Sequence, residues 1–308
     1  MNNYLKLFFL LCTSTVYSQE VSRQSVVNTL SVLASDQMKG REIGTPQNDS
    51  AAVFIAKRFE ENNLDYCVGT SFLVPFEYKG KTAYNVCGIK KGKSDKSLAY
   101  SAHFDHIGSN GKGPDPIFNG ADDNASGVSL MIGLSEYFKT SAPEFSMIFM
   151  AFNGEEKGMK GSKAIAEEVQ LQKYFNNTQA LFNFEMVATV SQFGANAMYM
   201  TGDTFSDLDE LMNTAAADQF KIHPDPYTGQ QLFYRSDNVV FAKKGIIAHS
   251  FSTVDMTTAK HYHQANDDLA VVNFDNLTLM INSLGKTIST LKPSDFSPKY
   301  NETVNLKR

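Results

Sequence analysis

The sequence predicts an α/β fold: a three-layer sandwich with a central mixed, mostly parallel sheet flanked by helices. From residue 98 onward, apolar segments of strand length alternate with segments of helical periodicity. This alternation is typical of parallel sheets that are covered on both faces. The chain also shows no internal repeat, low-complexity tract or linker, and 290 of its 308 residues follow the first 18. We therefore expect residues 19–308 to form a single domain around one core.

The first 18 residues have the pattern of a secretory signal peptide. They carry one positive charge, Lys6, then the apolar run 7–12 and the small-residue ending 16–18. The run is too short to span a bilayer, and a buried helix would leave residues 13–19 without a helical pattern. Leu11 precedes Cys12 where bacterial lipoprotein signals need a small residue. We expect a secreted or periplasmic protein with no membrane anchor after cleavage.

Two helices and a hairpin are predicted first. Val26, Leu30 and Leu33 share one helix face, and an i, i+3, i+4, i+7 pattern begins at Ala52. The loop 40–49, with its Thr-Pro pair, opens the second helix. The segments 72–78 and 82–89 roughly alternate and predict a hairpin. The short connection 90–96 leaves no room for an inserted domain.

The alternating part of the chain follows. The predicted strands are 98–102, 145–152, 180–184, 197–200 and 246–252. The predicted helices are 128–138, one starting near Ser162, one opened by a Ser206/Asp209 capping pair, and 274–291.

Charge and cysteine content restrict the function classes. The net charge of −5 becomes −6 once Lys6 is removed, so the chain has no basic surface for nucleic acid or anionic membrane. Cys67 and Cys87 remain after cleavage, and export permits a disulfide, although two buried thiols fit equally well. Neither lies in a Cys-x-x-Cys pattern, which argues against a thiolate metal site.

Candidate metal ligands follow the predicted strands. His103 comes directly after 98–102, Glu156 soon after 145–152, and Glu185 directly after 180–184. The carboxyl ends of parallel strands meet at one rim, so these side chains should converge. With Asp123 from a loop between two glycines and with His263, they supply two imidazoles and three carboxylates. Such a set can hold two zinc ions with one bridging carboxylate, and the neighbouring Glu155 is left over as a general base.

Each residue also has an ordinary explanation. Glu155 and Glu156 resemble a charge pair at a helix start, and residues 122–124 resemble an acidic turn. His263 competes with His261, Asp267 and Asp268. His103 differs because the nearby Asp105 is placed to accept its second ring N–H, as partners of metal-bound histidines do. Glu185 differs because it interrupts an apolar run, where an unpaired carboxylate is costly. Three other histidines are expected to be surface or core residues: His106, His223 and His249.

The motifs HFDHIG, GADDNASG, NGEEKGMKGS and YHQANDD, in this order, resemble the M28 metallopeptidases, a family of co-catalytic zinc aminopeptidases and related exopeptidases. The resemblance extends from residue 40 to residue 269. It implies one α/β domain with two Zn²⁺ ions and Glu155 as general base. It also implies that Asp123 bridges the ions, with Glu156 and His263 at one and His103 and Glu185 at the other. Family members usually have Asp at the position of Glu185.

The resemblance bears on two further features. Tyr262 would donate a hydrogen bond to the oxyanion, as a tyrosine there does in some relatives, although a packing role fits it equally. The Asp123–Asn124 peptide bond would be cis, as relatives often have it.

The expected function is an exported di-zinc aminopeptidase that acts on peptides. A dipeptidase or carboxypeptidase on the same site is an alternative, with Arg41 and Arg235 as the hints of carboxylate recognition. A glutaminyl cyclase-type acyltransferase, which uses one zinc ion, is disfavoured because relatives of that type have tryptophans around the site and this chain has none. A metal-free binding protein is disfavoured because all six site positions carry competent residues.

Overall fold

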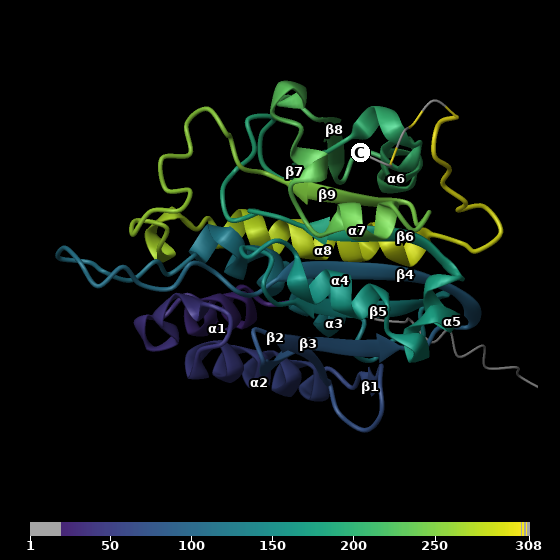
Figure 1. Cartoon of the computed structure of the whole chain (residues 1–308). Helices are drawn as coiled ribbons and strands as arrows, with labels where there is room; N and C mark the ends of the chain where they lie inside the picture. Colours follow the sequence, from purple (N-terminus) through teal and green to yellow (C-terminus); the bar gives the residue numbers. More distant parts are fainter. Residues whose placement is uncertain (1–19, 303, 305, 307–308) are drawn as a thin grey trace, which may run out of the picture.

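A computed structural model describes residues 20–302, 304 and 306. The predicted signal peptide, residues 1–18, lies outside this range. The described chain forms a mixed nine-stranded sheet with helices on both faces (Figure 1), which confirms the predicted fold class. Among the described residues, no helix is both long enough and apolar enough to cross a bilayer.

The strands are β1 (Asp65–Tyr66), β2 (Leu73–Tyr78), β3 (Lys81–Lys90), β4 (Ser94–His103), β5 (Phe145–Phe152), β6 (Thr178–Phe184), β7 (Ala197–Met200), β8 (Lys221–Pro224) and β9 (Ala248–Ser252). The α-helices are α1 (Arg23–Leu33), α2 (Pro46–Glu61), α3 (Gly127–Tyr137), α4 (Lys160–Ala166), α5 (Gln172–Phe175), α6 (Leu208–Ala216), α7 (Asn238–Ala242) and α8 (Phe274–Thr290). Only residues 91–93 separate β3 from β4, so no domain is inserted there.

The strand order β1-β3-β5-β4-β6-β9-β7-β8 puts the parallel strands β5, β4, β6 and β9 in the middle of the sheet. The β3–β5 and β7–β9 pairs on either side are antiparallel, and β2 pairs only with β3. In the parallel part, His103 lies opposite Phe152, and Ser101 lies opposite Asn183. The chain segments that follow β4, β5 and β6 therefore leave the sheet side by side at one rim.

Both faces of the central strands are buried, and alternate residues enter two different cores. On β5, Met147, Phe149 and Ala151 pack with α1, α2, α3, α6 and α8 on one face. Ile148, Met150 and Phe152 pack with α4, α5 and α7 on the other. An unbroken apolar run such as 145–152 is what a strand covered on both sides requires.

Helix starts agree with the sequence except at α6. The Thr45 side chain caps α2 and Pro46 is its first residue, as predicted. The predicted Ser206/Asp209 capping pair is wrong, because α6 starts at Leu208 after Asp207. The Ser206 hydroxyl instead donates to Nε2 of buried His249, at 2.8 Å. The same hydroxyl accepts the N–H of Leu208 at 3.3 Å, so a long-range partner is added to one local hydrogen bond.

Cys67 and Cys87 form a disulfide that joins the segment after β1 to β3. The bridge closes a loop with a sequence separation of 20 residues. We expect its reduction to lower the free energy of unfolding by about 3 kcal/mol, because the reduced unfolded chain gains entropy. Urea unfolding with and without reductant measures this change, and a Cys67→Ala/Cys87→Ala variant should ignore the reductant. An equal unfolding midpoint in both states would contradict the prediction.

Candidate metal centre

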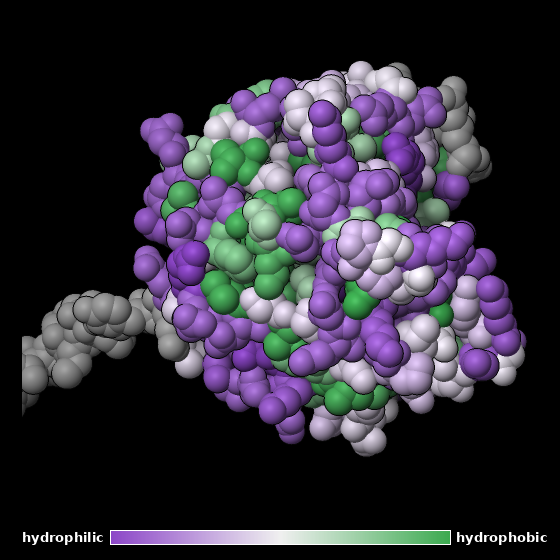
Figure 2. Space-filling view, turned by 90° about the vertical axis from the view of Figure 1, so that its left-hand side faces the viewer, coloured by the Kyte–Doolittle hydropathy of each residue, from purple (hydrophilic) through white to green (hydrophobic). Residues whose placement is uncertain are grey.

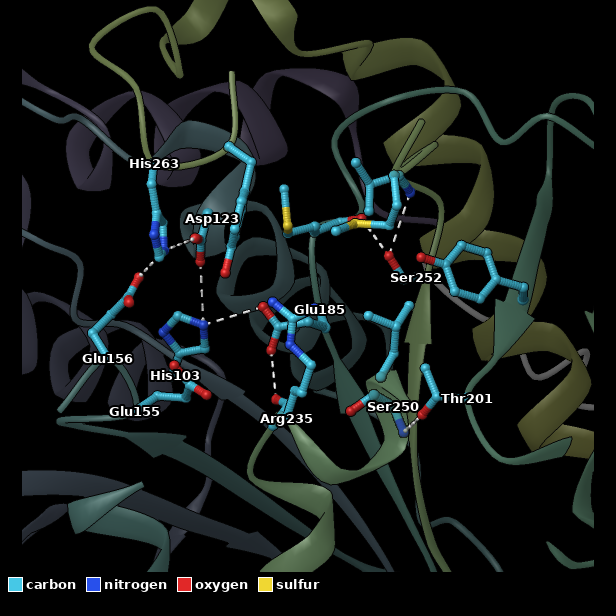
Figure 3. A pocket seen from close by; sticks show the side chains of 17 residues that line it. His103, Asp123, Glu155, Glu156, Glu185, Thr201, Arg235, Ser250, Ser252 and His263 are labelled. Atoms are coloured by element: carbon cyan, nitrogen blue, oxygen red, sulfur yellow. Dashed lines mark hydrogen bonds and ion pairs between the residues drawn. The ribbon is translucent and has the colours of Figure 1, made fainter. Parts of the chain in front are cut away.

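The five predicted ligands come from two strand ends, two turns and one loop, and they meet in one cleft (Figure 3). His103 is the last residue of β4, and Glu185 is the first residue after β6. Glu156 lies in the turn after β5, and His263 lies in the loop between β9 and α8. Asp123 belongs to the turn before α3, which opens with Gly120 in the left-handed region (φ +60°). The Asp123–Asn124 peptide bond is cis, as the resemblance predicted.

Asp123 is at the centre of the cluster, and its two oxygens face different partners. Oδ1 lies 3.4 Å from Nε2 of His103, which is 3.1 Å from Oε1 of Glu185. Oδ2 lies 3.2 Å from Nε2 of His263, which is 3.1 Å from Oε1 of Glu156. The cluster thus has two halves that share one carboxylate.

Each half has the spacing that zinc requires. Zinc binds nitrogen and oxygen ligands at about 2.0–2.2 Å in a tetrahedron, so its ligand atoms lie roughly 3.3 Å apart. The histidine–carboxylate distances in the two halves are 3.1–3.4 Å. Glu185, where Asp is usual, fits because Oε2 accepts a hydrogen bond from the Ser236 hydroxyl at 2.6 Å. That bond leaves Oε1 facing His103.

Neighbouring residues hold the ligands in place. Nδ1–H of His103 donates to the backbone carbonyl of Asp105 at 3.1 Å, which leaves Nε2 free for a metal. The Asp105 carboxylate, which the sequence predicts as the acceptor of this bond, is 3.7 Å away. The carboxylate accepts the backbone N–H groups of Glu155 and Glu156 instead, at 3.0 and 3.3 Å. On the other side, the Asn124 side chain binds Phe184 O and Met186 N, the groups on either side of Glu185.

Burial and charge in the cleft favour a base and a cation site. Burial raises the pKa of the Glu155 carboxyl well above its usual range, against an opposing effect of His103. Hydrogen bonds to Asp123 and Glu156 raise the pKa of His263 to about 10. The carboxylates of Asp123 and Glu156 therefore stabilise the protonated, positively charged form of His263. Within the part of the chain that the structure describes, the Glu155 carboxylate makes no hydrogen bond or ion pair with either half, so it remains available for proton transfer.

The loop around His263 resolves the competition among its neighbours. Nε2–H of His261 donates to the Asp122 carboxylate at 2.8 Å. The Asp267 carboxylate accepts the backbone N–H groups of Asp122 and Asp123. Asp268 caps a short turn by accepting the N–H of Ala270. His263 is thus the residue of this loop whose side chain faces the cluster.

His106, expected from the sequence to be an ordinary surface or core histidine, lies at the site. It is fully buried, as a core histidine would be, but Nδ1 lies 3.0 Å from Oε1 of Glu156 and 3.7 Å from Oδ2 of Asp123. Its ring packs against Gly120, where a Cβ atom would be 2.6 Å from the ring. The one feature of the sequence that could have indicated a site role for His106 is its position three residues after His103, just beyond the end of the predicted strand. His249 is buried and partly exposed His223 stacks on Phe193, both as expected.

Replacing His106 with Phe should weaken metal binding by roughly 10–100-fold, the usual cost of losing a residue that orients a metal ligand. The phenyl ring fills the space but removes the Nδ1 group beside Glu156. Competition with a chromophoric chelator measures the affinity, and His223→Phe is the matched control. Equal affinities for both variants would show that His106 does not act on the site.

The two arginines differ in role from what was expected. Arg41 is fully buried and donates to four backbone carbonyls, those of Leu33, Phe104, Asn119 and Gly120. It therefore holds the loops under the site and is not available for a substrate carboxylate. Arg235 is exposed and lines the cleft.

The cleft continues beyond the cluster into a pocket. Its walls include the apolar side chains of Met186, Leu232, Val254 and Met256, and hydroxyl groups from β7 and β9. Tyr262 stacks on His263 at 4.0 Å between ring centroids and also lines the pocket. Figure 2 views the side of the molecule to which β4 and β9 point, and apolar side chains gather there within a polar surround.

Known proteins with similar sequences include an aminopeptidase. The sequence model of peptidase family M28 matches residues 85–287. Aminopeptidase YwaD of Bacillus subtilis is 28% identical over 206 residues, which are 65% of this chain and 43% of that protein. The alkaline phosphatase isozyme conversion protein of Escherichia coli is 25% identical over 144 residues, 42% of each chain. This chain thus spans less than half the length of these relatives.

Solved structures share the fold. The zinc aminopeptidase BSAP from Bacillus subtilis superimposes with a TM-score of 0.68 at 18% identity, over 89% of this chain and 96% of that one. A glutaminyl cyclase from Bacteroides thetaiotaomicron, bound to N-acetylhistamine, has the same TM-score at 15% identity, over 89% and 100%. Because both types of enzyme have this architecture, the fold alone does not separate their chemistries.

Proposed function

The chain belongs to peptidase family M28, and on that premise we propose that it is an exported di-zinc aminopeptidase that removes N-terminal residues from peptides. The observation that carries the proposal is the pair of donor sets that share Asp123. His103 and Glu185 would complete one zinc site with Asp123, and Glu156 and His263 the other. A site that binds a single zinc ion needs only one donor set, so the presence of two sets favours two ions.

The chemistry follows from the positions of the side chains. When bound, a pair of zinc ions lowers the pKa of a bound water and polarises a carbonyl oxygen. Glu155, which lines the same cleft as both donor sets and whose backbone N–H donates to Asp105, would accept the proton of the attacking water. The same carboxyl would then donate that proton to the departing amine. The apolar pocket walls would hold the substrate and exclude bulk water.

We expect Tyr262→Phe to lower kcat by roughly 10²–10³-fold with little change in KM, the typical effect of losing one oxyanion donor. Burial raises the pKa of Tyr262 to about 12, so its hydroxyl keeps the proton that it would donate at neutral pH. Steady-state kinetics on one peptide series measures the two constants. If kcat is unchanged, Tyr262 serves only to pack against His263.

Two features support export. Residues 1–18 have the composition of a signal peptide. Disulfides persist in oxidising compartments and are rare in the cytosol, and Cys67 is bonded to Cys87. The mature protein would be the single domain 19–308 in the periplasm or the medium. Its negative charge fits peptide substrates and argues against nucleic acid partners.

Arg235 supports a second candidate, a dipeptidase or carboxypeptidase. It lines the pocket, and none of the salt bridges among the described residues involves it. A guanidinium group in this position suits a substrate carboxylate. The aminopeptidase remains preferred because the apolar pocket wall provides a place for a side chain next to the metals.

One experiment separates the candidates. The mature protein is analysed for zinc and assayed on free, N-acetylated and C-terminally amidated peptides. We expect two zinc ions per chain, cleavage of free and amidated peptides, and no cleavage of acetylated ones. Cleavage restricted to substrates with a free carboxylate would indicate the second candidate. Cyclisation of N-terminal glutamine with one zinc ion and no hydrolysis would indicate a glutaminyl cyclase and refute the proposal.

A further inference from the structure

We propose that Asp122, the neighbour of the predicted bridging ligand, is a positioning residue that, with His261, assembles the metal centre before any metal binds. The inference rests on the proposed function, because it concerns the same zinc site. It adds a role for two residues that are not among the predicted ligands.

The Asp122 carboxylate joins the loops of two other predicted ligands. It is fully buried. Oδ2 accepts a hydrogen bond from Nε2–H of His261 at 2.8 Å, two residues before His263. Oδ1 accepts one from the backbone N–H of Ala188 at 2.9 Å, three residues after Glu185. One side chain therefore connects the turn of Asp123 to the His263 loop and to the segment after Glu185.

Asp267, which follows His263 in the same loop, also binds the turn that contains Asp123. The Asp267 carboxylate accepts the N–H groups of Asp122 and Asp123 at 2.7 and 3.0 Å. Its backbone carbonyl accepts the N–H of Ala121 at 3.1 Å. The His263 loop is thus attached to the Asp123 turn both before and after His263. The relative position of two ligands for one zinc ion is set by protein–protein hydrogen bonds.

This arrangement should increase metal affinity. Two loops ordered in advance lose little conformational entropy when zinc binds, so more of the bond energy appears as affinity. A carboxylate suits position 122 because both of its oxygens accept, and each faces an N–H donor. An amide there would turn an NH₂ group toward one of the two donors.

The test compares His261→Leu, which removes the donor, with His261→Gln, whose amide can still donate to Asp122. His249→Leu is the matched control, because His249 is also buried and makes a hydrogen bond of 2.8 Å, to Ser206, away from the cluster. For each mature protein we would measure zinc affinity by chelator competition, zinc content, and the Tm of the metal-free form. The isosteric variant Asp122→Asn tests the same contact from the side of the acceptor, because it replaces one carboxylate oxygen with an NH₂ group.

We expect His261→Leu and Asp122→Asn to weaken zinc binding by roughly 10–100-fold, the range for partners of metal ligands. His261→Gln should stay close to wild type, and His249→Leu should keep wild-type affinity even where its metal-free Tm falls. Equal zinc affinity in His261→Leu and wild type, or equal loss in His261→Leu and His249→Leu, would overturn the inference. A His261→Gln protein as weak as His261→Leu would also overturn it.

A measurement on the unaltered protein completes the test. In the metal-free form, the amide hydrogens of Asp122, Asp123 and Ala188 should exchange slowly, because their acceptors belong to the protein. Fast exchange that slows only with zinc would overturn pre-assembly. A wild-type protein that binds no zinc would instead refute the proposed function. Two zinc ions in wild type with unchanged affinity in the variants would refute the positioning role alone.

Discussion

Replacing Glu155 with Gln should lower kcat by about 10²–10⁴-fold while the zinc content stays at the wild-type level. This is the usual contribution of a general base, and Gln keeps the size of the side chain while it removes the proton acceptor. The backbone N–H of residue 155 still donates to Asp105 at 3.0 Å, so the new side chain should occupy the same place. Steady-state kinetics with metal analysis of the same samples measures both quantities.

The control is Glu167→Gln, because Glu167 is exposed and pairs only with Lys244 among the described residues. That variant should match wild type in kcat and zinc content. If Glu155→Gln retains its zinc and full activity, Glu155 is not the base. If it loses zinc, Glu155 is a ligand and the two neighbouring glutamates have exchanged roles.

Replacing Glu156 with Gln should instead remove zinc from one half of the centre. Oε1 of Glu156 lies 3.1 Å from Nε2 of His263 and 3.0 Å from Nδ1 of His106. A neutral amide oxygen is a weaker ligand than a carboxylate, so zinc occupancy should fall toward one ion per chain and kcat should fall with it. Metal analysis after dialysis against a weak chelator measures the occupancy.

Added zinc separates the two variants. Activity of Glu156→Gln should recover in part as the zinc concentration rises, since the defect is in affinity. Activity of Glu155→Gln should not recover, because its defect is in proton transfer. A Glu156→Gln protein that holds two zinc ions after dialysis would exclude Glu156 as a ligand.

The sequence could predict those parts of the site that depend on one strand at a time. The apolar run 145–152 begins and ends sharply in the sequence, so the bounds of the strand could be predicted, and β5 has these bounds. The first polar residue after such a run is at the rim, which located His103 and Glu185. Glu156 was located because it follows a predicted strand closely, and Asp123 by its glycine-flanked loop and by the family resemblance. The structure brings these four predicted ligands together in one cleft.

The rest depends on contacts between distant segments, which local patterns do not encode. Arg41 has the charge of a substrate-binding residue, but the carbonyls that bury it include those of Phe104 and Gly120, more than 60 residues away. Ser206 has the side chain of a helix cap and accepts the N–H of Leu208, but its shorter hydrogen bond is to His249. His106 looked ordinary because its approach to Glu156 arises only when the turn after β5 folds against the end of β4. Periodicity also does not reveal that β7 runs antiparallel to β9.

The strand order has a consequence for how the molecule opens. Transient unfolding of a sheet begins at its least protected edge and rarely reaches the centre. β1 and β2 are the outer strands on one side and β8 is the outer strand on the other, whereas β4 and β6, which end at His103 and next to Glu185, are in the middle. The disulfide fastens the β1 side to β3, so fraying should start at β8. We therefore expect the outer strands on that side to detach and return while the predicted ligands His103 and Glu185 stay in register.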